Sequence, residues 1–166
     1  MRLIAAALLI LLGAWIQGSP FNDLLTWQFD LLLAVVIAWA VGAGPRAGLA
    51  IGFAAGAVQD ILLGGGMTYA ILKGLIGFGA GALRPLLHDR QGMVVAPLIL
   101  VFALIQDAAI ALLLGMRGFG VPGNEWLAIA LPAAAGGALL GWPLSLGVRW
   151  VLHRTRNPWA LREAQQ

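Results

Sequence analysis

Six long apolar segments, separated by short connections, make up most of this chain of 166 residues. The segments run over residues 3–17, 27–41, 47–63, 67–83, 93–116 and 126–151. A helix needs about 20 apolar residues to cross the hydrocarbon core of a bilayer, and each segment reaches or approaches that length. Short connections make consecutive helices antiparallel neighbours. We therefore predict an all-α integral membrane protein in which six transmembrane helices form one compact bundle.

The composition indicates that lipid, rather than water, surrounds most of the chain. Hydrophobic residues account for 61% of the sequence and charged residues for only 10%, whereas about a quarter of an ordinary soluble domain is charged. The seven tryptophans fit this interpretation, because Trp is enriched where membrane meets water. Cysteine is absent from the sequence, which excludes disulfides and thiolate chemistry.

The N-terminal stretch MRLIAAALLILLGAW also resembles a secretory signal peptide. It has one arginine followed by an apolar run, but neither a small-residue cleavage site nor a hydrophilic mature domain follows. We expect it to remain as the first transmembrane helix.

The arginines predict the orientation of the helices. With the N-terminus in the cytoplasm, the outer side of the membrane holds a single arginine, Arg117. The inner side then holds eight, namely Arg2, Arg46, Arg84, Arg90, Arg149, Arg154, Arg156 and Arg162. Cytoplasmic loops carry the excess of basic residues in membrane proteins. We therefore predict that both termini are cytoplasmic, and that the net charge of +3 reflects topology rather than nucleic-acid binding.

Two parts follow from this topology: a six-span transmembrane domain over residues 1–151 and a short basic cytoplasmic tail over residues 152–166. The tail either serves as a plain topological anchor or contacts anionic lipid headgroups or a cytoplasmic partner. The anchor is the favoured interpretation.

Small residues recur at every fourth position in four of the segments, and each row also contains an ionisable residue. Positions four apart lie nearly above one another on a helix, and small residues let transmembrane helices approach closely. The predicted helix-packing residues are Gly48, Gly52, Gly56, Gly77, Gly81, Gly137 and Gly141. The ionisable residues on these rows should face protein, since a charge at the bilayer centre costs at least about 2.5–3.5 kcal/mol.

Three of these ionisable residues are predicted to meet inside the bundle. From a rise of about 1.5 Å per residue, Asp60, Lys73 and Asp107 lie about 6, 10 and 12 Å from the outer ends of their segments. We predict a buried intramembrane charge cluster of Asp60, Lys73 and Asp107. It could serve a proton or substrate path, or it could fix the register of the helices. The second interpretation is favoured, because the inner halves of these segments are almost purely Gly, Ala and aliphatic residues.

The sequence carries none of the usual signatures of an enzyme. It shows no nucleophile–base pair, no phosphate-binding loop and no zinc-ligand spacing. His88 and His153 lie in separate polar stretches beside arginines. We predict no catalytic, cofactor-binding or metal-binding residues.

The chain resembles the MreD family, the small integral membrane subunit of the bacterial rod-shape (elongasome) complex. The resemblance rests on Asp30 in FDLLLAVV, GPR at residues 44–46, GFAAGAVQD at residues 52–60, Asp107, and WP at residues 142–143 followed by a basic tail. It departs from the family pattern at Phe29, where a proline is frequent. It departs again at Met67, Thr68 and Tyr69, where the family has a glycine.

The resemblance implies a non-enzymatic scaffold subunit of the bacterial inner membrane that supports peptidoglycan synthesis and cell shape. MreD-like proteins partner MreC and, through the complex, MreB, RodA and a class B penicillin-binding protein. The fold also looks similar to the substrate-binding subunits of ECF vitamin transporters. A substrate-binding subunit of a small-solute transporter is therefore the alternative function.

Overall fold

The computed structural model of the protein describes residues 2–17, 29–64, 66–87, 91–118 and 125–154. Within these ranges the chain forms α-helices and one short 3-10 helix, and no strand. The elements are α1 (Arg2–Gln17), α3 (Leu31–Ala43), α4 (Pro45–Leu63), α5 (Thr68–Ala82), η1 (Arg84–Leu87), α6 (Gln91–Met116) and α7 (Glu125–Arg154). Each apolar segment of the sequence contains one α-helix, so the all-helical prediction is confirmed.

In the described part of the chain, three helices are long and apolar enough to cross a membrane: α4 over Pro45–Leu63, α6 over Val94–Met116 and α7 over Trp126–Val148. The apolar stretches of α1 and α3, Ile4–Gln17 and Leu31–Ala43, are shorter. These lengths agree with a helical membrane protein. The six-span topology and the cytoplasmic position of both termini stay predictions.

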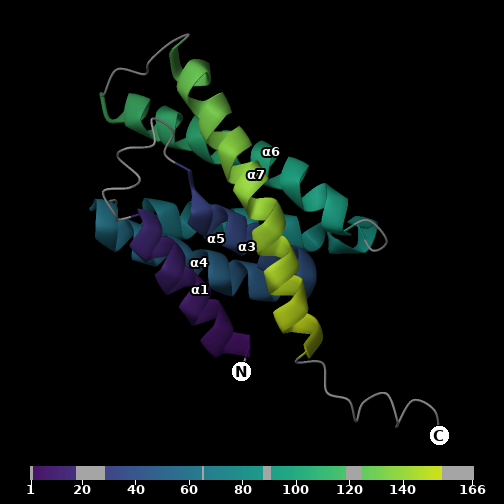
Figure 1. Ribbon diagram of the computed structural model, residues 1–166. Helices are drawn as coiled ribbons and strands as arrows, with labels where there is room; N and C mark the ends of the chain where they lie inside the picture. The colour runs from purple at the N-terminus through teal and green to yellow at the C-terminus, as the bar shows by residue number, and fades with distance from the viewer. Residues whose placement is uncertain (1, 18–28, 65, 88–90, 119–124, 155–166) are drawn as a thin grey trace, which may run out of the picture.

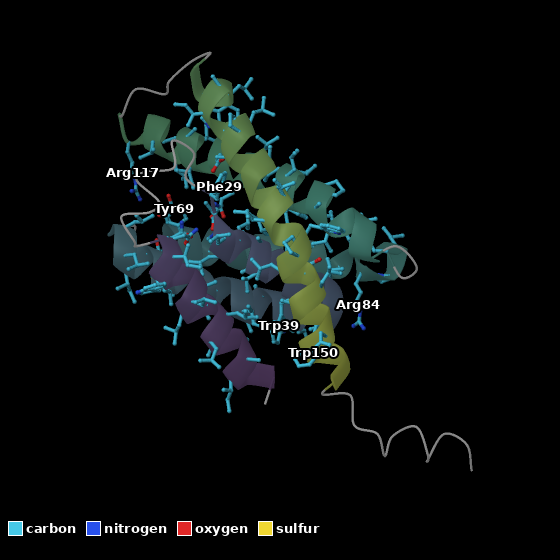
Figure 2. All side chains as sticks on the ribbon, in the orientation of Figure 1. Phe29, Trp39, Tyr69, Arg84, Arg117 and Trp150 are labelled. Atoms are coloured by element: carbon cyan, nitrogen blue, oxygen red, sulfur yellow. The ribbon has the colours of Figure 1, made fainter. Side chains whose placement is uncertain are left out.

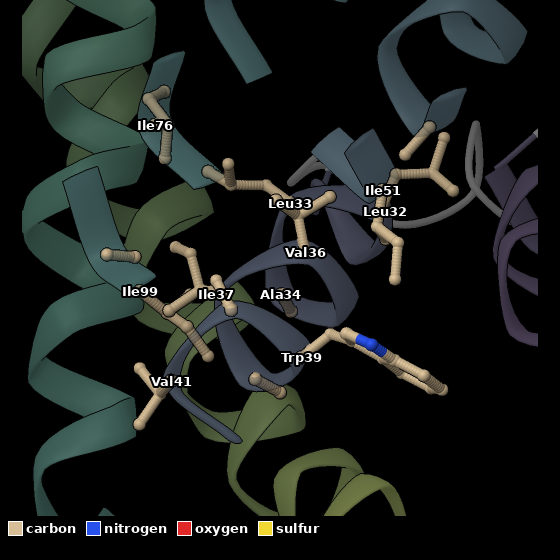
Figure 3. Packing of buried hydrophobic residues seen from close by; sticks show 14 of the residues in the cluster. Leu32, Leu33, Ala34, Val36, Ile37, Trp39, Val41, Ile51, Ile76 and Ile99 are labelled. Atoms are coloured by element: carbon tan, nitrogen blue, oxygen red, sulfur yellow. The ribbon is translucent and has the colours of Figure 1, made fainter. Parts of the chain in front are cut away.

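Helix α3 lies at the centre of the bundle and contacts α1, α4, α5, α6 and α7 (Figure 1). All of its residues from 32 to 41 are buried. Figure 3 shows its side chains packed against Ile51 of α4, Ile76 of α5 and Ile99 of α6. The sequence of α3, LLLAVVIAWAVGA, has no polar face, and a helix that is apolar all round belongs in the interior of a protein.

Helices α4 and α5 form an antiparallel pair whose backbones touch along a seam of glycines. A Cβ atom added at Gly48, Gly52 or Gly56 of α4 would overlap the backbone of α5. The contacts pair Gly48 with Gly77, Gly52 with Lys73, Gly56 with Tyr69, and Gly81 with Gly44 and Pro45. Close approach of this kind brings the backbones into dispersion contact, which holds membrane helices together.

Helices α6 and α7 pack on each other and on α3, whereas α6 touches α5 only slightly. At Gly141 of α7 an added Cβ would overlap Ile99 of α6 and lie 3.1 Å from Ala34 of α3. At Gly137 an added Cβ would make only ordinary contact, 4.0 Å from Ile99. In Figure 1 the last turns of α6 and the first turns of α7 lie away from α4 and α5.

Candidate functional site

A carboxylate at the start of α3 collects donors from four helices. Asp30 Oδ1 accepts hydrogen bonds from the backbone N–H of Leu33 at 2.9 Å and from Gln17 Nε2 at 3.3 Å. Asp30 Oδ2 accepts a hydrogen bond from Gln106 Nε2 at 2.7 Å and forms an ion pair with Lys73 Nζ. We call Gln17, Asp30, Lys73 and Gln106 the Asp30 hub. It joins α1, α3, α5 and α6.

The hub is buried inside the bundle. The side chain of Lys73 is 0% exposed and that of Asp30 is 18% exposed, while Gln106 is 2% exposed. A charge removed from water in this way is stabilised only when its partner and further hydrogen bonds are in place. The local reason for the position of Asp30 is its role as the N-cap of α3, since the N–H of Leu33 would otherwise lack an acceptor.

A second buried carboxylate, Asp60 near the end of α4, caps helix α5. Its Oδ1 accepts the backbone N–H of Tyr69 at 3.1 Å, and its Oδ2 accepts that of Ala70 at 2.8 Å. The first N–H groups of a helix have no partner within the helix, and the helix dipole favours an anion there. Met67, at the N-cap position of α5, supplies no side-chain hydrogen bond. Asp60 therefore caps the N-terminus of α5 from the neighbouring helix α4.

The structure gives Lys73 a partner from outside the predicted cluster of Asp60, Lys73 and Asp107. Lys73 pairs with Asp30, not with Asp60. The physical reason is that both oxygens of Asp60 already accept hydrogen bonds from the start of α5. Moreover, α3 has only 13 residues, and its N-cap lies against the other helices rather than at the rim of the bundle.

The third residue of the predicted cluster, Asp107 on α6, is close to the hub but outside its hydrogen bonds. It is half-buried and lies within electrostatic range of Asp30 and Lys73. Its carboxylate makes no hydrogen bond and no ion pair with any residue that the structure describes. The hydroxyl group of Tyr69 lies within electrostatic range of Asp30, Asp60 and Asp107 together.

Sequence reasoning missed the two amides and the central role of Asp30. One signal for Asp30 is available in the sequence, because Asp is a preferred N-cap and this one directly precedes an uninterrupted apolar run. Gln106 stands next to Asp107 in the sequence, but only the packing of α6 against α3 shows which of the two side chains turns inward.

The labelled aromatic and arginine side chains lie toward both ends of the bundle. Figure 2 places Phe29, Tyr69 and Arg117 toward one end and Arg84 and Trp150 toward the other. In the described part of the chain, no three His, Cys, Asp or Glu side chains are grouped so that they could hold a metal ion.

Comparison with known proteins gives one family match. The family model of the rod shape-determining protein MreD matches residues 2–142. The matched range includes all four residues of the Asp30 hub, and Asp60 and Asp107 as well. No solved structure matches the chain, so the likeness to vitamin-transporter subunits stays a prediction.

Proposed function

The chain belongs to the MreD family of rod shape-determining membrane proteins, and from that premise we propose that it is a multi-pass subunit of the bacterial inner membrane that assembles the cell-wall elongation complex. It binds MreC directly and, through the complex, supports MreB, RodA and a class B penicillin-binding protein in peptidoglycan synthesis. The family match over residues 2–142 is the observation that carries this proposal.

The polar residues of the bundle support a scaffold. Asp30 and Asp60 use their hydrogen bonds to hold helices of the same chain together. A residue on a transport path would instead need freedom to exchange a proton or a solute. The hub therefore favours the architectural interpretation of the buried charges over the path.

Complementation with co-purification tests the proposal. The tagged chain is expressed in a rod-shaped bacterium whose own family member is deleted. We expect it to restore rod shape and to co-purify with a single-pass protein that has a periplasmic domain. A tight complex with a vitamin-sized solute and no such protein would instead establish the transporter alternative.

A further inference from the structure

Three carboxylates and one lysine occupy neighbouring positions in the bundle, and one of the carboxylates has no polar partner among the described residues. Asp30 is compensated by Lys73 and the amides of the hub. Asp60 is compensated by the start of α5. Asp107 has neither an ion pair nor a hydrogen bond among the described residues. The negative charge of this region is therefore not balanced by the side chains that surround it.

The position of Asp107 makes this imbalance costly. It lies well inside the apolar span Val94–Met116 of α6, at a position that is partly exposed. A carboxylate at such depth costs about 2.5–3.5 kcal/mol when it faces lipid.

Among the residues that the structure describes, no Lys, Arg or His side chain forms an ion pair with Asp107. The sequence of residues 18–28 and 119–124 contains no Lys, Arg or His. Arg117 lies ten positions further along the chain and is exposed, which is about 15 Å along a helix axis. Arg46 and Arg84 belong to the opposite end of α4 and α5. Lys73, the cation within electrostatic range, is already paired with Asp30, so the Asp107 carboxylate is left for a cation of another molecule.

The surface beside Asp107 can accept a helix. α6 packs on α7 and α3 and only slightly on α5, and the residues that follow Asp107 at helical spacing are the partly exposed Ala111 and Gly115. Small residues of this kind allow a second helix to approach closely.

We propose that the α6 face at Asp107 binds a transmembrane helix of a partner protein through a basic side chain that pairs with the Asp107 carboxylate. The inference rests on the proposed function, because it assigns a surface of the assembly subunit to one partner. The Lys or Arg of that helix lies at the depth of Asp107, and the apolar remainder of the helix packs along Ala111 and Gly115.

The first test removes the charge without changing the shape. Asp107→Asn should leave the melting temperature of the purified protein within a few degrees of the wild type and reduce the co-purified partner about threefold or more. Asp107→Glu keeps the charge and should retain most of the partner. Asp107→Asn protein that captures as much partner as the wild type would overturn the inference, while rod-shape complementation by the wild-type chain would leave the proposed function standing.

The second test locates the partner helix. A photo-crosslinking amino acid is placed at Leu114, on the Asp107 face, or at Ile105, on the opposite face; these positions are 42% and 51% exposed. Position 114 should crosslink to a transmembrane segment that contains Lys or Arg, and exchange of that residue for Asp should restore binding to Asp107→Lys. Equal crosslinking from position 105, a crosslink to a second copy of this chain, or a partner segment with no basic residue would each overturn the inference.

Discussion

At the scale of single residues, Asp30 shows how one carboxylate can organise a membrane protein. Its four donors come from four different helices, so a shift of α1, α3, α5 or α6 relative to the other three would break a contact to it. Removal of one member of a buried ion pair destabilises a soluble protein by about 3–5 kcal/mol. In membrane proteins, the coupling energy of a polar side-chain contact averages about 0.6 kcal/mol.

We expect Asp30→Asn or Lys73→Met alone to lower the free energy of unfolding by about 1–3 kcal/mol. The double variant should recover part of that loss, because no unpaired charge remains, and unfolding in detergent would measure it. Losses that simply add in the double-mutant cycle would show that the two side chains are not coupled.

Asp60 acts on a different partner, so its variants should behave differently. Asp60→Ala leaves the N–H groups of Tyr69 and Ala70 without an acceptor and should cost about 0.5–2 kcal/mol, as the loss of a helix cap does. Asp60→Asn keeps one acceptor and should cost less. Combination with Lys73→Met should be close to additive in the same unfolding measurement. Strong rescue by Lys73→Met would instead show that Asp60 is coupled to Lys73, as in the predicted cluster.

At the scale of elements, the sequence was sufficient to place the helices but not to choose their neighbours. Apolar length and spacing predicted where α4 and α5 run, and four-residue glycine rows predicted surfaces of close packing, because both depend on one helix at a time. The partner of Lys73 depends on a third helix. Asp30 stands near the start of the apolar segment 27–41, yet in the structure it lies inside the bundle as the N-cap of the short α3.

The glycine seam between α4 and α5 can be tested with a matched pair of substitutions. Gly52→Ala places a methyl group against the backbone of Lys73 and should force the helices apart, which costs about 1–3 kcal/mol. Gly147→Ala on α7 meets no atom within 4 Å and should leave stability unchanged or slightly raised. Melting temperatures in detergent would compare the two. Equal values would show that the seam contributes no close packing.

At the scale of the whole molecule, topology is the prediction with the widest consequences. Reporter fusions after residues 65 and 120 should report the outer side of the membrane, and fusions after residues 90 and 166 the cytoplasm, because the arginines retain their flanking loops inside. Alkaline phosphatase and a fluorescent protein, fused separately at each site, would report on which side of the membrane that site lies. Opposite results at two of these sites would exclude the six-span arrangement, and with it the depth at which Asp107 meets a partner.

The two residues of the ion pair in the Asp30 hub are synthesised at different times on the ribosome. Asp30 and Lys73 are 43 residues apart in the chain, so at roughly 5–20 residues per second the carboxylate is made about 2–9 s before the ammonium group. During that interval α3 has a charged end and no counterion, and its insertion should stay incomplete. Nascent chains that stop at residue 64 should therefore be degraded faster than chains that stop at residue 87, and pulse-chase labelling would measure the difference. Lys73→Met should remove the advantage of the longer chain. The resistance of the nascent chain to membrane proteases would then depend on synthesis of its fourth apolar segment.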